Sequence, residues 1–152
     1  VTQPHFIAER GDAYLREVAV DDQPWLYRLL GFLDAGVPLA AGTDAPYGEP
    51  DPWASMQAAV TRRTREGHRI GAAEALTPEQ ALALFTAPLE APGAAPRRIE
   101  AGAPADLCLL ATSWCEARAD LSVAQVRQTF RNGVETWRAD TTRAAAAVVR
   151  QS

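Results

Sequence analysis

The chain has 152 residues with 47% hydrophobic and 22% charged side chains, a composition that indicates a folded globular protein and excludes a disordered one. Its net charge of −4 argues against a nucleic-acid-binding protein, which usually carries a basic face. Because no apolar run reaches the roughly 20 residues of a membrane-spanning helix, and two cysteines are too few for a disulfide framework, we expect a cytoplasmic protein without membrane or nucleic-acid partners.

The sequence opens with a short β-favouring segment. Val1 and Thr2 predict the end of a strand, and a proline follows closely. Since the chain begins with valine rather than methionine, we expect an upstream part of the protein to precede it. Gln3 can bind a substrate or a neighbouring loop, and His5 can contact a substrate or a metal, although a lone histidine is more often a hydrogen-bonded structural residue. The other histidine, His68, lies in a predicted turn, and we interpret it as a surface residue.

Two helices are predicted next. Residues 9–18 carry a weak helical stripe. In residues 25–33 the apolar side chains recur at helical spacing, which predicts a single amphipathic helix. Asp21 can cap its start, and Gly36 can end it because glycine tolerates the left-handed conformation of a helix C-cap.

A short apolar run at residues 37–41 predicts a parallel strand that is buried on both faces. The run continues into Gly-Thr-Asp-Ala-Pro, which places Asp44 just past the end of the strand. Ligands bind at that edge in α/β sheets and barrels. A carboxylate there can hold a divalent metal or take a proton from water that the metal activates. The alternative is an Asx turn, in which the side chain of Asp44 bonds its own loop.

The middle of the chain predicts two more helices. Residues 53–65 form the first. Residues 77–86 form the second, since Thr77 can cap it, proline suits its first position and Gln80 completes a capping box. Three prolines and a glycine then make residues 88–96 a linker or edge loop.

The last third of the chain is β-rich. Residues 105–110 predict an apolar strand, and we interpret Cys108 inside it as a core residue. Asn132 and Gly133 separate two β-like runs, which is a strong signal for a hairpin. The first two thirds alternate strand and helix, so the pattern predicts an α/β unit followed by a small β module. The tail from residue 141 is alanine-rich and predicts a helix or a frayed end.

Several of these stretches resemble the amidohydrolase superfamily, and more narrowly its family 3, the branch with N-substituted formamide deformylase-like proteins. The Gly-Thr-Asp-Ala-Pro run and the Gly-x-Pro-Ala-Asp-Leu run, in this order and at this distance, make the resemblance specific, and it extends to about residue 139. The similar stretches are residues 1–4, 39–46, 51–53, 76–82 and 99–107, with the closing β run to Trp137.

The resemblance implies an α/β fold: the C-terminal part of a TIM-type (β/α)₈ barrel followed by strands of a small β-sandwich. Residues 1–96 would form the barrel part, with its last two strands at residues 1–4 and 37–43. Residues 97–140 would supply the sandwich part, and residues 141–152 a tail.

The resemblance also implies chemistry: hydrolysis of a C–N bond of amide or formamide type in a small molecule, with a divalent metal, most commonly zinc. Asp44 would be both a metal ligand and the catalytic proton shuttle, while His5 and Gln3 would contact the substrate. The family's other metal ligands are missing from this sequence. Some relatives have a histidine one position after that of His5, where this chain has Phe6, so the resemblance gives His5 no metal-binding role.

These missing ligands lead to two alternatives. Because a working zinc site needs about three protein ligands, we expect this polypeptide to be an inactive C-terminal fragment of a metal-dependent amidohydrolase. The alternative is a non-catalytic binding or assembly module that retains the end of the fold. The sequence is also compatible with a homo-oligomer.

Overall fold

A computed structural model describes residues 1–140, so the predicted tail at residues 141–152 lies outside the described residues. The chain divides into two compact units. The first comprises Val1–Arg97 with Arg118–Ser122, and the second comprises Arg98–Ala117 with the described residues from Val123 on. No helix in the described part combines the length and the apolarity needed to cross a bilayer.

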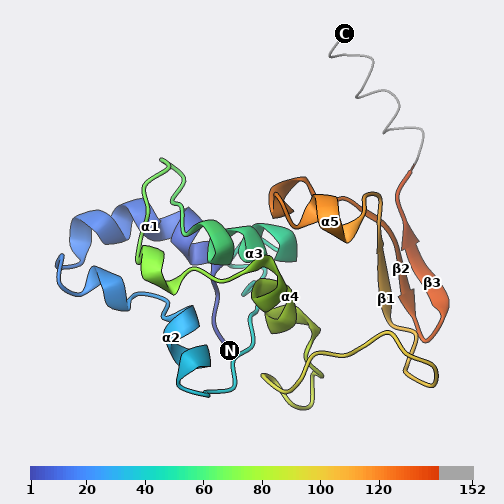
Figure 1. Cartoon of the computed structure of the whole chain (residues 1–152). Coiled ribbons are helices and arrows are strands. Elements are labelled where there is room, and N and C mark those ends of the chain that lie inside the picture. Colours follow the sequence, from blue (N-terminus) through green and yellow to red (C-terminus); the bar gives the residue numbers. More distant parts are fainter. Residues whose placement is uncertain (141–152) are drawn as a thin grey trace, which may run out of the picture. The chain divides into compact units, whose positions relative to one another are not determined.

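The first unit is helical. It contains α1 (His5–Glu17), α2 (Leu29–Asp34), α3 (Pro52–Thr61) and α4 (Pro78–Thr86), with short 3₁₀ helices at Gln23–Trp25 and Ala72–Glu74. Helix α3 packs against both α1 and α4 (Figure 1). The buried apolar side chains of this unit include Ile7, Leu29, Met56, Ala59, Ala81 and Leu84. The first unit is therefore organised around α3.

Local capping signals place two of these helix starts. Asp51 precedes α3, and its carboxylate accepts a hydrogen bond from the amide of Trp53. At α4 the hydroxyl of Thr77 accepts from the amide of Gln80, and the Gln80 side chain accepts from the amide of Thr77. The predicted capping box is confirmed, since two otherwise unsatisfied donors find partners within four residues.

The single helix predicted across residues 25–33 is wrong. The structure has a 3₁₀ helix at Gln23–Trp25, then a break at Tyr27 with φ of 52°, and α2 begins only at Leu29. The carbonyl oxygens of Leu26 and Tyr27 accept hydrogen bonds from the guanidinium of Arg62, at 2.8 and 2.9 Å. A distant side chain therefore takes the carbonyls that a continuous helix would have used.

The two strands predicted at residues 1–2 and 37–41 are reduced to one parallel bridge between Thr2 and Ala41. The amide of Thr2 donates to the carbonyl of Ala40, and the amide of Gly42 donates back to the carbonyl of Thr2, both at 2.9 Å. Val37 is 44% exposed, so the run is not buried as predicted. An extended strand needs paired neighbours along its length, and here the amide of Ala41 donates to the carbonyl of Leu84 in α4 instead.

The second unit contains a three-stranded antiparallel sheet in the order β1-β2-β3, formed by β1 (Leu107–Leu110), β2 (Val126–Arg131) and β3 (Val134–Arg138). Between β1 and β2 the chain forms a short helix, α5 (Trp114–Ala117), and a 3₁₀ helix at Leu121–Val123. Asn132 and Gly133 both have positive φ, at 49° and 77°, which is the geometry of the predicted tight hairpin. Cys108 is exposed, which corrects its assignment to the core.

Candidate active site

The bridge between Thr2 and Ala41 brings the predicted site residues to the same end of two chain segments. The segments are parallel, so Gln3 and His5 follow one of them where Asp44 follows the other. Gln3 is half-buried, and its carbonyl oxygen accepts from the amide of Phe6 as α1 begins. The sequence order alone placed these residues about 40 positions apart, and the backbone pairing makes them neighbours.

Asp44 is exposed and lies at the start of a tight turn. Its φ of 55° is left-handed, a conformation that aspartate tolerates better than most residues. The carbonyl oxygen of Asp44 accepts hydrogen bonds from the amides of Tyr47 and Gly48, at 2.9 and 3.1 Å. The backbone, rather than the carboxylate, therefore closes this turn. This disfavours the Asx turn and leaves the carboxylate open to solvent.

His5 is buried, with 2% of its surface exposed. Its ring lies against Gly48, where a Cβ would overlap both the Nε2 of His5 and the carbonyl oxygen of Thr43. Neither ring nitrogen has a hydrogen-bond partner among the described residues. Burial lowers the pKa of His5, and the nearby carboxylates of Glu9 and Asp44 only partly oppose this. The imidazole is therefore neutral at neutral pH.

The loop after Asp44 is fastened to one face of α1. The guanidinium carbon of Arg10 lies 4.5 Å from the ring centroid of Phe6 and 4.7 Å from that of Tyr47. The two rings meet edge to face, with centroids 6.1 Å apart. Close by, the amide of Glu49 donates to the carboxylate of Glu9 at 3.0 Å. Sequence analysis missed Arg10, although its spacing of four from Phe6 places both on one helix face.

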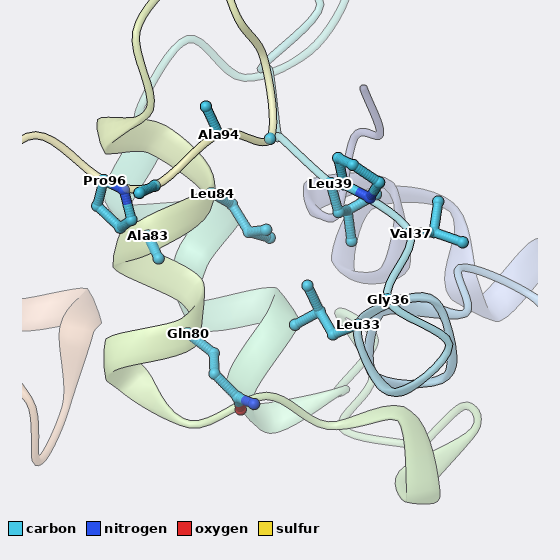
Figure 2. Close-up of a pocket in the computed structure, with 12 residues that line it drawn as sticks. Leu33, Gly36, Val37, Leu39, Gln80, Ala83, Leu84, Ala94 and Pro96 are labelled. Atoms are coloured by element: carbon cyan, nitrogen blue, oxygen red, sulfur yellow. The ribbon is translucent and has the colours of Figure 1, made fainter.

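A separate apolar groove of about 390 Å³ lies elsewhere in the first unit. Figure 2 shows Leu33 of α2 and Leu84 of α4 directed into the same space, with Leu39 and Ala94 nearby. Its lining is aliphatic apart from Gln80 and backbone groups, and none of the predicted site residues belongs to it. The groove therefore offers no group that could carry out hydrolysis.

Comparison with known proteins identifies the family. The model of the amidohydrolase family matches residues 2–137 of this chain. The chain belongs to the amidohydrolase family. An N-substituted formamide deformylase from Arthrobacter pascens is 34% identical over 113 residues, which cover 72% of this chain and 21% of that protein. No solved structure matches. The resemblance to amidohydrolase family 3 is thus confirmed, and this amidohydrolase chain spans about a fifth of the length of the curated relative it matches.

Amidohydrolases are generally metal-dependent, so the residues around Asp44 can be tested against a metal. The exposed carboxylate of Asp44 fits as one ligand. The nitrogens of His5 do not, because both are enclosed. A catalytic zinc takes three protein ligands and keeps one position open. Around Asp44, the described residues of this amidohydrolase chain therefore offer one potential ligand and do not complete a catalytic zinc site.

A second group of potential ligands lies further along α1. Ligand atoms of Asp12, Glu66 and His68 lie within 4.8 Å of one another. His68 was interpreted as a surface residue; it is exposed, but its Nδ1 pairs with Asp12 at 3.1 Å. The amide of Glu66 also donates to Asp12, at 3.1 Å. Burial raises the pKa of Asp12, but hydrogen bonds from Thr64, His68 and the Glu66 amide outweigh burial and hold it below its ordinary value. These hydrogen bonds give the group a structural role, because they connect α1 to the turn that follows α3.

Proposed function

We propose that this chain supplies part of the active site of a metal-dependent hydrolase that cleaves C–N bonds of amide or formamide type. Membership of the amidohydrolase family and the 34% identity to a protein named N-substituted formamide deformylase support the reaction class. The observation that carries the proposal is the exposed carboxylate of Asp44, which follows the parallel bridge at a fixed backbone turn. No other described residue combines that position with a free carboxylate.

Asp44 acts in this proposal as the proton shuttle. It takes a proton from the attacking water as the new C–O bond forms, and it returns the proton to the nitrogen as the C–N bond breaks. A carboxylate open to solvent is suited to this exchange, and its backbone is already positioned by the turn. A divalent metal such as zinc, when bound, polarises the carbonyl group and makes water more acidic.

Gln3 and His5 are proposed as substrate contacts. Gln3 lies at the same end of the bridge and is partly accessible. His5 can reach a substrate only if the loop containing Gly48 moves, because that glycine covers its ring. We therefore propose Gln3 as the more direct contact and His5 as one that depends on loop displacement.

The fold proposal follows the same family relationship. Residues 1–96 would be the C-terminal part of a TIM-type barrel and residues 97–140 part of a small β-sandwich. The parallel bridge supports neighbouring barrel strands at Thr2 and Ala41, and the antiparallel sheet supports the sandwich. Because two strands cannot close a barrel and one carboxylate cannot hold a catalytic zinc, we propose that this chain alone is inactive.

The test compares this chain with the complete coding region that contains it. Each protein is assayed with zinc or manganese against N-substituted formamides and N-acyl amino acids, and its metal content is measured. We expect turnover only from the longer protein, and we expect Asp44→Asn to lower kcat by roughly 10²-fold or more. Asp34→Asn, at an exposed carboxylate at the end of α2, is the matched control. Full activity in Asp44→Asn would refute the role of Asp44, and a longer protein without turnover would favour the non-catalytic module.

A further inference from the structure

We propose that Arg10 is a positioning residue for Asp44: its guanidinium, packed against the rings of both Phe6 and Tyr47, fastens the loop of residues 44–49 to α1. The contacts that define this clamp lie within the first unit. The inference rests on the proposed function only in assigning a catalytic role to Asp44. The clamp itself can be measured without any enzymatic activity.

The backbone of Asp44 needs such support. Its left-handed conformation is sparsely populated by residues other than glycine, and such conformations persist where the surrounding structure fixes them. One end of the loop is fixed by the hydrogen bonds from Tyr47 and Gly48 to the carbonyl oxygen of Asp44. These bonds hold the turn together, but they do not attach it to the rest of the protein. The direction of the Asp44 carboxylate therefore depends on what holds residues 47–49.

Three consecutive loop residues contact the first turns of α1. Tyr47 covers the guanidinium of Arg10, Gly48 lies on the ring of His5, and the amide of Glu49 binds the carboxylate of Glu9. His5 and Glu9 are four positions apart, as are Phe6 and Arg10, so these two pairs form adjoining strips along the first turns of α1. The loop is thus attached to the same helix that begins directly after the bridge to Ala41.

Arg10 is suited to this role by its chemistry. The guanidinium of arginine is planar, weakly hydrated and always charged, so it packs against aromatic rings more readily than the compact, strongly hydrated ammonium group of lysine. Tyr47 is 68% exposed, so little of its ring is held by burial. The contact with Arg10, together with the edge of Phe6, is therefore the main side-chain attachment of Tyr47 among the described residues.

The experiment uses NMR on the full 152-residue chain. It measures the exchange rates of the Tyr47 and Gly48 amides and the Cα and Cβ chemical shifts of Asp44, which report its backbone conformation. We expect Arg10→Ala and Tyr47→Ala each to raise these exchange rates about tenfold or more and to move the Asp44 shifts towards random-coil values. Tyr47→Phe keeps the ring against Arg10 and loses only the hydroxyl that interacts with the guanidinium, so it should retain most of the protection. Arg16→Ala removes an exposed arginine from the same helix and is the matched control.

Unchanged exchange and shifts in Arg10→Ala would overturn the clamp. If Arg10→Ala loosens all of α1, including the amide of Val18, Tyr47→Ala decides, because it leaves the helix sequence intact; wild-type protection in that variant overturns the proposal. The failure of the proposed function is a separate result. Asp44→Asn with full activity in the longer protein would refute catalysis by Asp44 while the NMR result for the loop still stands.

Discussion

The imidazole ring of His5 packs directly against the backbone of Gly48, so that no side chain fits at position 48 without moving the ring or the carbonyl group of Thr43. This contact joins the first turn of α1 to the loop that carries Asp44. It explains why a glycine stands there although its φ is not positive. The packing of these two residues makes both the stability and the pH response of this region testable.

Gly48→Ala should destabilise the first unit. The new methyl group overlaps the Nε2 of His5 and the carbonyl oxygen of Thr43, and overpacking of this kind typically costs about 1–3 kcal/mol. Urea unfolding monitored by tryptophan fluorescence measures the loss. The matched control is Gly42→Ala, where the nearest atom to a new Cβ is 3.7 Å away, in Val1. Equal stability of the two variants would contradict the close packing of His5 and Gly48.

The first unit should lose stability as the pH falls below about 6.5, the ordinary pKa of histidine. Burial lowers the pKa of His5 in the folded protein, so the unfolded chain binds the proton more readily. The contribution of His5 to stability is therefore fully present above the pKa that His5 has in the unfolded chain. It is lost as the pH falls from that value to the lower pKa of His5 in the folded protein. Urea titrations between pH 5 and pH 8 measure this slope.

His5→Gln should flatten that slope, whereas His68→Gln should retain it, because His68 is exposed and paired with Asp12. Both variants are compared with the wild type by the change of unfolding free energy with pH, so a difference in absolute stability does not obscure the result. A slope that survives in His5→Gln but disappears in His68→Gln would contradict this prediction, because it would assign the pH response to His68.

Arg62→Met should destabilise the first unit strongly. Arg62 is fully buried and donates hydrogen bonds to the carbonyls of Leu26, Tyr27 and Ile70. Burial lowers its pKa to about 10, so it remains charged at neutral pH. Methionine fills a similar space but removes the side-chain donor of all three carbonyls, of which Tyr27 keeps the amide of Leu29 as a donor; each buried group left unsatisfied costs roughly 1–3 kcal/mol.

The neighbouring Arg63→Met is the control for this prediction. Arg63 is exposed, and its guanidinium donates to the single carbonyl of Gly67. We expect its effect on the free energy of unfolding to stay within about 1 kcal/mol, as for most surface substitutions. Comparable losses for the two variants would mean that the three buried hydrogen bonds of Arg62 contribute little.

Thr77→Ala should lower stability by about 1 kcal/mol, the usual effect of removing a helix N-cap side chain. The hydroxyl of Thr77 accepts from the amide of Gln80, and alanine leaves that donor without its partner. Thr77→Ser keeps the hydroxyl and serves as the control. Thermal unfolding followed by circular dichroism measures both variants, and a serine variant as unstable as the alanine variant would argue against a capping role.

Features that depend on neighbouring residues could be predicted from the sequence. The capping box of Thr77 and Gln80 and the hairpin at Asn132 and Gly133 follow from local hydrogen bonding and local backbone preference, and both are found. The family could also be predicted, because the spacing of two short motifs is a property of the linear chain. The position of Asp44 directly after an apolar run can likewise be seen in the linear chain, but its catalytic role stays a prediction.

Features that depend on distant residues were decided by the tertiary structure. The helix expected across residues 25–33 is interrupted because Arg62, about 35 positions away, donates hydrogen bonds to the carbonyls of Leu26 and Tyr27. In a continuous helix these carbonyls would accept from amides of the helix itself. The expected strands shrink to one bridge because pairing depends on the neighbours available in space. The contacts of Arg10 with Phe6 and Tyr47 join a helix to a loop that lies 37 positions further along the chain. Side-chain contacts of this kind have no periodic signature, so only the folded chain reveals what holds Asp44 in place.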